Sequence, residues 1–206
     1  MRNRVLMLAL LLSIPAHAAT AQPASGPNHW TQLTAPDPFG AWRFFDPVRS
    51  RFVLVPFWPS AREYWELRLD SPDAWQRGEW RGTGPDEARV RALVYDPRHD
   101  RLLVFARDSR HGPTGDAPLT IWGVPQDGTG EWLELANLTE PPIDRSDFTV
   151  VYDSKRQSFV LFGGSAGPPD GSPPGFSDLW RVDVQGGAAL WAPLQTEGDS
   201  VTAHTR

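Results

Sequence analysis

The chain has 206 residues, a formal net charge of −5 and no cysteine. The lack of cysteine excludes disulfides, thiolate metal sites and cysteine nucleophiles, and the acidic charge argues against a broad nucleic-acid-binding face, which is normally basic. Ten tryptophans, 21 prolines and 18 glycines indicate many turns and many large packing residues.

The first 18 residues have the pattern of a secretory signal peptide. Two arginines precede an apolar stretch over residues 5–14, and an A-x-A cleavage site ends at Ala18. The apolar stretch is shorter than the roughly 20 residues that a membrane-spanning helix needs, although an uncleaved anchor is the alternative. We therefore predict cleavage after Ala18, a disordered leader over residues 19–28, and a secreted or periplasmic mature protein without a membrane span.

Three segments of the mature chain align without a gap: FFDPVRSRFVLV at 44–55, VYDPRHDRLLVF at 94–105 and VYDSKRQSFVLF at 151–162. Each has an aromatic residue, an aspartate, a short polar turn and an apolar run. An aspartate side chain can bond to the backbone two residues further on, and apolar runs flank the turn, so each segment is predicted to be a β-hairpin. The aligned aspartates are Asp46, Asp96 and Asp153.

Tryptophans recur after each hairpin. Trp65, Trp122 and Trp180 lie in strand-like runs, and a second tryptophan follows each of them. Each unit is therefore predicted to have four short strands, with the recurring tryptophans packed between units. The second set consists of Trp75, Trp132 and Trp191, with Trp30 as a further member.

The third unit carries the clearest family features. In RSDFTVVYDSKRQSFVLFGG an arginine precedes the first strand and the Gly163-Gly164 pair ends the second, and Trp191 lies in the fourth. With these features the unit resembles a Kelch repeat of the galactose-oxidase-like propeller family. The other two units have different residues in place of the double glycine. The resemblance covers nearly the whole mature chain and implies an all-β propeller of four-stranded blades.

The resemblance also implies an incomplete set of blades within residues 29–206. Residues 29–34 resemble the fourth strand of a closing blade, and residues 203–206 resemble the start of a fourth blade. Closed Kelch rings have more blades than the three found here, so half a propeller is expected. A truncated fragment, two copies assembling a ring, and a short open array remain as explanations. The three predicted blades span about 41–80, 89–135 and 145–194.

Candidate ligand contacts follow from the expected loops. In Kelch propellers the loops between strands 2 and 3 and those between strand 4 and the next blade share one side, which often binds ligands. The alternative is a solvated surface of scattered charges. The candidate contacts are Trp58, Arg62, Arg107, Arg110, His111, Asp86, Glu140 and Asp144. The structural repeat positions are Asp46, Asp96, Asp153, Gly163, Gly164, Trp30, Trp132 and Trp191.

Catalytic residues, metals and cofactors are not predicted. The histidines lack ligand spacing, and the oxidase chemistry of the namesake family needs a tyrosine crosslinked to a cysteine, which this chain cannot supply. The segment Asn137-Leu138-Thr139 is a glycosylation sequon.

Three functions remain open at this point. The first is an exported, non-catalytic module that recognises carbohydrate or protein through the loop face. The second is an exported Kelch-type enzyme such as a sialic-acid-like sugar mutarotase, which would need an acid/base pair. The third is an assembly subunit, or a fragment of a larger propeller, that associates with itself through the blade faces.

Overall fold

The computed structural model describes residues 40–56, 63–71, 74–86, 89–111, 117–128, 130–166 and 175–195. Within these ranges the chain forms twelve β-strands and no α-helix, so the predicted all-β class is confirmed. Several predicted features lie outside the described residues: the predicted signal peptide and leader, the two predicted partial blades at 29–34 and 203–206, and the candidate residues Trp30, Trp58 and Arg62.

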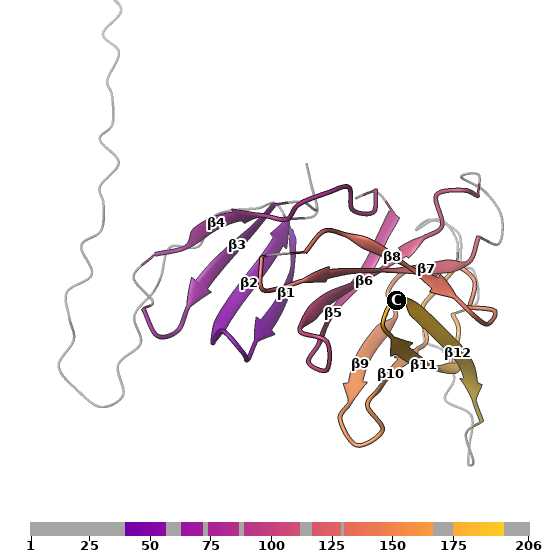
Figure 1. Cartoon of the computed structure of the whole chain (residues 1–206). Coiled ribbons are helices and arrows are strands. Elements are labelled where there is room, and N and C mark those ends of the chain that lie inside the picture. Colours follow the sequence, from indigo (N-terminus) through magenta and orange to yellow (C-terminus); the bar gives the residue numbers. More distant parts are fainter. Residues whose placement is uncertain are drawn as a thin grey trace, which may run out of the picture. The chain divides into compact units, whose positions relative to one another are not determined.

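The first four strands form an antiparallel sheet in the order β1-β2-β3-β4, called here the first group. Each strand pairs with the next along the chain, as expected where short polar turns separate runs of strand-forming residues. Figure 1 shows these strands in purple. They are β1 (Ala41–Asp46), β2 (Arg51–Pro56), β3 (Glu63–Arg68) and β4 (Gln76–Glu79).

The other eight strands form one sheet in the order β5-β6-β7-β8-β12-β11-β10-β9. Its halves are the second group, β5–β8, and the third group, β9–β12, and each half is again an antiparallel meander. A short parallel pairing of β8 with β12 joins the two halves, through Ala136 with Ala188 and Asn137 with Ala189. The strands are β5 (Val90–Asp96), β6 (Arg101–Arg107), β7 (Leu119–Pro125), β8 (Leu133–Asn137), β9 (Thr149–Asp153), β10 (Ser158–Phe162), β11 (Leu179–Gln185) and β12 (Ala188–Leu194).

The aspartate-led segments form the same turn in each group. Asp96 accepts a hydrogen bond from the backbone N–H of Arg98 at 3.1 Å, and Asp46 and Asp153 accept the corresponding bonds two and three residues further on. The last residue of the turn has a positive φ in all three groups, which lets four residues reverse the chain between paired strands. These residues are Ser50, Asp100 and Gln157, with φ of 46°, 47° and 54°.

The core lies between consecutive groups. One buried cluster joins Phe44 and Val53 of the first group to Tyr95 and Leu102 of the second, and the rings of Phe44 and Tyr95 stack with centroids 6.3 Å apart. A second cluster joins the second group to the third and includes Phe105 beside Trp191. The apolar runs of the three hairpins thus pack face to face across group boundaries.

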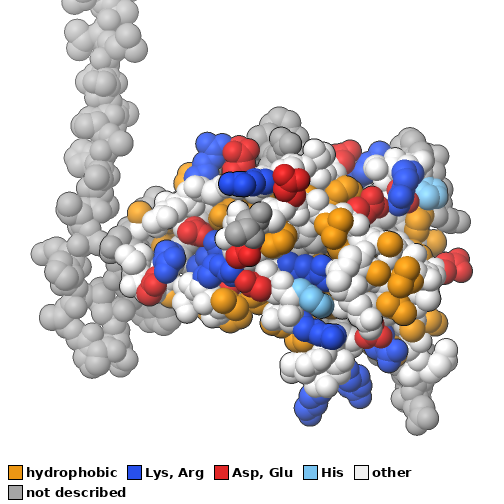
Figure 2. Space-filling model, in the orientation of Figure 1, with side chains coloured by type: hydrophobic (Ala, Val, Ile, Leu, Met, Phe, Trp, Pro, Cys, Tyr) orange, Lys and Arg blue, Asp and Glu red, His pale blue; other side chains and the backbone are white. Residues whose placement is uncertain are grey.

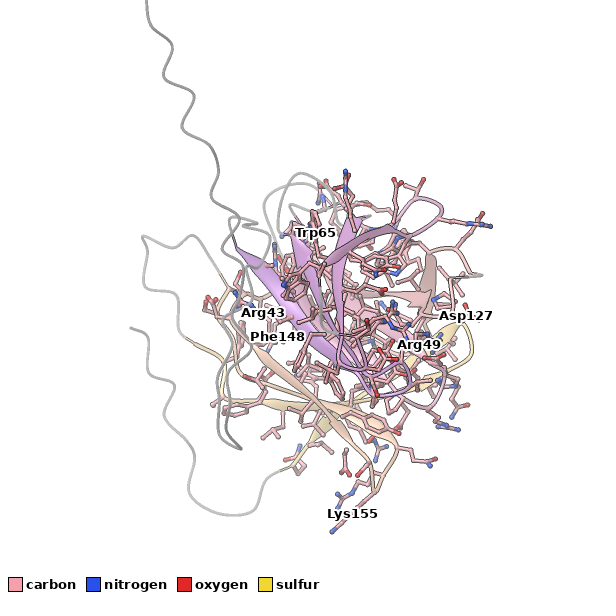
Figure 3. All side chains as sticks on the ribbon, turned by 90° about the vertical axis from the view of Figure 1, so that its left-hand side faces the viewer. Arg43, Arg49, Trp65, Asp127, Phe148 and Lys155 are labelled. Atoms are coloured by element: carbon pink, nitrogen blue, oxygen red, sulfur yellow. The ribbon has the colours of Figure 1, made fainter. Side chains whose placement is uncertain are left out.

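A buried arginine at the start of the second strand links the first group to the second and the second group to the third. Arg51 binds Asp46 in its own turn and donates to the backbone oxygen of Gln126, in the β7–β8 turn of the following group, at 3.2 Å. Arg101 repeats this arrangement, donating to Asp96 and to the oxygen of Gly186 in the β11–β12 turn at 2.7 Å. In Figure 3, Arg49 and Asp127 mark the β1–β2 and β7–β8 turns, which lie on the same side.

The third group differs at this position. Ser158 stands where the other groups have arginine, and its buried hydroxyl makes no hydrogen bond. The aspartate of this turn, Asp153, instead pairs with the exposed Arg156 at 2.8 Å. The linking arginine is therefore present at the two contacts between groups within the chain and is replaced in the third group.

The glycine pair, Trp191 in β12 and Trp132 just before β8 occupy tight positions. Gly164 has a φ of 99°, and a Cβ added there would lie 2.8 Å from the backbone oxygen of Ser146. The Trp191 indole N–H donates to Asn137 Oδ1 at 2.9 Å, while the Asn137 amide donates to the Leu119 oxygen. Trp132 is buried against the edge of Trp80. The side chain of the sequon asparagine is thus a structural link between two groups.

Candidate functional site

The described candidate residues divide between two loop segments and their neighbours. Arg107 ends β6, and Arg110 and His111 follow it before the strand-2-to-3 loop continues towards β7. Asp144 lies in the segment between β8 and β9, where Glu140 is exposed. Asp86, in the segment before β5, binds Arg89 at 3.2 Å.

Asp144 brings two sequence-distant arginines together. It accepts two hydrogen bonds from Arg91, at 2.8 and 2.9 Å, and a longer one from Arg107 at 3.4 Å. All three side chains are at most 20 % exposed. The paired contact of a guanidinium with both carboxylate oxygens fixes the orientation of both groups, so Arg91 and Asp144 form a rigid base for this end of the second group.

The backbone explains why Asp144 lies here. Its N–H donates to the oxygen of Ala117 at 2.6 Å, and Leu119 N–H donates to the oxygen of Pro142 at 3.0 Å. The segment before β9 is therefore paired with the residues that lead into β7. The N–H of Asp108 donates to the Pro118 oxygen, which holds the start of the 2–3 loop beside the same strand.

Asp108 organises the exposed part of this loop. It accepts hydrogen bonds from the backbone and the guanidinium of Arg110, each at 2.8 Å, and lies 3.3 Å from His111 Nδ1. Burial raises the pKa of the Asp108 carboxyl, but the hydrogen bonds from Arg110 outweigh burial and the pKa lies below its usual range. Arg110 also reaches Glu134 at 3.0 Å.

We call the residues Arg91, Arg107, Asp108, Arg110, His111 and Asp144 the polar rim. Its inner members are held by ion pairs, whereas the side chains of Arg110 and His111 are 67 % and 51 % exposed. Figure 2 shows basic, acidic and histidine side chains next to one another on the surface. Exposed guanidinium and imidazole groups can donate to hydroxyl, carboxylate or carbonyl oxygens of a ligand.

Sequence reasoning missed two members of the polar rim, Arg91 and Asp108. Arg91 lies at a β-bulge, because Val90 pairs with Ala106 as Ala41 pairs with Pro56 and the register then shifts before Ala92. No local pattern in the sequence marks this position. Asp108 follows Arg107 directly and binds the backbone two residues on, as the repeat aspartates do. The predicted contacts Asp86 and Glu140 are exposed, and Asp86 pairs with Arg89.

A second charged network lies at the β1–β2 and β5–β6 turns. Arg49 of the first group binds Asp100 of the second through two hydrogen bonds, at 2.8 and 2.6 Å, and Tyr95 donates to the same carboxylate. Burial, followed by this hydrogen bond, raises the pKa of Tyr95, and the hydrogen bonds from Arg49 lower that of Asp100. These contacts hold two groups together.

His99 lies 2.8 Å from Asp96 in the same turn, an arrangement that can orient an imidazole for proton transfer. Asp96 also accepts from the backbone of Arg98 and from the buried Arg101. Its role in the turn therefore accounts for its burial without any catalytic function.

Neither metal clusters nor membrane helices occur in the described part of the chain. No three histidine or acidic side chains there converge as a metal site requires, and no helix there is long and apolar enough to cross a membrane. No protein-family model matches the chain, and a search of curated proteins found no match either.

Proposed function

We propose that the chain is an exported, non-catalytic binding module of the Kelch type, which recognises carbohydrate or protein at the polar rim. The observation that carries this proposal is the convergence of Arg91 and Arg107 on Asp144, which joins the loop after β6 to the segment before β9. Ligand sites commonly combine a rigid base with a few exposed polar groups, and Arg110 and His111 supply the exposed groups.

The proposed architecture is three consecutive propeller blades formed by the three groups. Its support is the four-stranded antiparallel order of each group, the repeated aspartate turn, and the contacts of β1 with β5 and of β5 with β9. In a propeller the first strands of neighbouring blades lie next to each other around the axis. The pairing of β8 with β12 joins the second and third groups into one sheet, whereas the blades of a propeller are separate sheets.

Export is proposed from the leader alone. The charged start, the apolar stretch and the A-x-A site at Ala18 support secretion or a periplasmic location. Amino-terminal sequencing of the protein recovered from the expressing cells tests this: Ala19 as the first residue is expected, and retention of Met1 contradicts cleavage.

The ligand proposal is tested by measuring the binding of the purified chain to immobilised neutral oligosaccharides, acidic oligosaccharides and peptides. We expect one class to bind, and Arg110→Ala to weaken that binding about tenfold or more, as the loss of one well-placed charged contact does. Arg156→Ala is the matched control, because Arg156 is 71 % exposed in the β9–β10 turn and outside the polar rim. Equal effects of the two variants, or no binding by any class, would contradict the proposal.

If a sugar binds, the rate at which its anomers exchange distinguishes a binding module from a mutarotase. A non-catalytic module leaves the exchange between the sugar's anomers at the uncatalysed rate, which NMR follows directly. Acceleration by the wild-type chain would overturn the proposal in favour of a mutarotase.

A further inference from the structure

The first and third groups each expose an apolar sheet face. In the first group Phe45 and Phe52, which are paired across β1 and β2, are 43 % and 45 % exposed. In the third group Val151 on β9 and Phe162 on β10 are 52 % and 39 % exposed. Large apolar side chains gathered on one face of a strand pair indicate an interaction surface more strongly than isolated ones do.

The repeat identifies what normally covers the first of these faces. In the second group the positions of Phe45 and Phe52 are occupied by Tyr95 and Leu102, which pair in the same register. These two side chains are only 9 % and 0 % exposed, because they pack on Phe44 and neighbouring residues of the first group. We call the face with the Phe45 and Phe52 positions the leading face of a group.

The repeat also identifies what covers the equivalent of the second exposed face, the one with Val151 and Phe162 in the third group. Val151 and Val160 of the third group correspond to Phe44 and Val53 of the first, which pair in the same way and are 9 % and 1 % exposed under the second group. We call this the trailing face. Within the chain, a trailing face packs on the leading face of the next group at both contacts between groups.

We infer that the leading face of the first group in one copy of the chain packs on the trailing face of the third group in a second copy. The two exposed faces correspond to the two halves of a contact that the chain already makes twice, so the repeat provides each face with a matching partner surface in a second copy. Such a head-to-tail contact is heterologous, and two copies that make it in both directions form a closed pair. This inference concerns the sheet faces and goes beyond the proposed ligand binding at the polar rim.

The contact between copies is expected to be weaker than the contacts within the chain. The position of the linking arginine is Ser158 in the third group, so the bond from Arg51 or Arg101 to the following group has no counterpart there. Reversible association that depends on the apolar side chains follows from this difference.

The mass of the chain from Ala19 onward in solution, measured by light scattering across micromolar concentrations, is the first test. We expect a mass of two chains that falls on dilution, and a single-chain mass for Phe52→Asp at the same concentrations. Leu138→Asp is the matched control, because Leu138 is 60 % exposed after β8 and lies on neither face. A wild-type chain that stays monomeric, or equal effects of the two variants, would overturn the inference.

Cross-linking tests the head-to-tail geometry, since the chain has no cysteine of its own. A short bismaleimide should link a Phe45→Cys chain to a Val151→Cys chain when the two are mixed, and should link neither variant to itself. Efficient linking of Phe45→Cys chains to one another would show that identical faces meet, which contradicts the inference. A mixture of Phe45→Cys and Leu138→Cys chains measures the background.

Discussion

Replacing Asp96 by asparagine tests whether the linking arginines stabilise the fold. Asp96 is 1 % exposed and accepts from Arg98 N–H and from Arg101 Nε, both at 3.1 Å. The amide keeps an oxygen for the turn but removes the negative charge beside Arg101, whose side chain is 9 % exposed. A buried charge without its partner is costly, whereas the turn itself is preserved.

The expected loss in the free energy of unfolding comes from the buried pair of Asp96 and Arg101. Removing one partner of a buried ion pair costs about 3–5 kcal/mol, and Arg101 retains its bond to the Gly186 oxygen, so we expect the lower end, about 3 kcal/mol. With a urea dependence of roughly 2 kcal/mol per molar, the midpoint of unfolding should fall by about 1.5 M. Equilibrium urea unfolding followed by tryptophan fluorescence measures this shift.

Asp153→Asn is the matched control because the repeat places it in the same turn. Asp153 pairs with Arg156, which is 71 % exposed, and an ion pair in contact with water contributes little. We expect a clearly smaller shift for this variant. Equal shifts for the two variants, or an unchanged midpoint for Asp96→Asn, would refute the reasoning that burial beside the linking arginine sets the cost.

Two further changes test the backbone and the second charged network. Gly164→Ala should cost about 3 kcal/mol, because φ is positive and the new Cβ meets the Ser146 oxygen, whereas Gly128→Ala, with positive φ in open space, should cost about 1 kcal/mol; similar losses in urea unfolding would contradict this. Arg49 lowers the folded-state pKa of Asp100, so the pair stabilises the fold above the usual aspartate pKa of about 3.9 and this stabilisation disappears as pH falls through the lowered value. Asp100→Asn should therefore destabilise the chain more at pH 7 than at pH 2, and a loss independent of pH would be inconsistent with the ion pair.

Local patterns in the sequence were sufficient to predict the strands and turns. The alignment around Asp46, Asp96 and Asp153 predicted hairpins because an aspartate, a polar turn and flanking apolar runs act within a few residues of one another. The structure has antiparallel strand pairs at all three places. The recurring tryptophans likewise indicated packing. Trp132 and Trp191 are buried, whereas Trp65, Trp75, Trp122 and Trp180 are half-buried.

The polar rim could be predicted only in part. Arg107 and Asp144 were selected from their expected loops, and the structure brings them within hydrogen-bond distance of each other. Arg91 was missed because a single charge in a strand has no local signature. Its partner Asp144 lies 53 residues away in sequence.

The sequence by itself determined the all-β class and the repeated hairpins, because these depend on short-range turn chemistry and on short apolar runs beside the turns. Only the tertiary structure decided which faces are covered. Phe45 and Tyr95 occupy the same repeat position, yet one is 43 % exposed and the other 9 %, because within the described residues a preceding group packs on Tyr95 and not on Phe45. The structure likewise shows that Ser158 replaces an arginine that bonds to the following group, because Arg51 and Arg101 make such bonds at the same repeat position. Such differences arise from neighbours that are distant in sequence, and a local pattern carries no information about them.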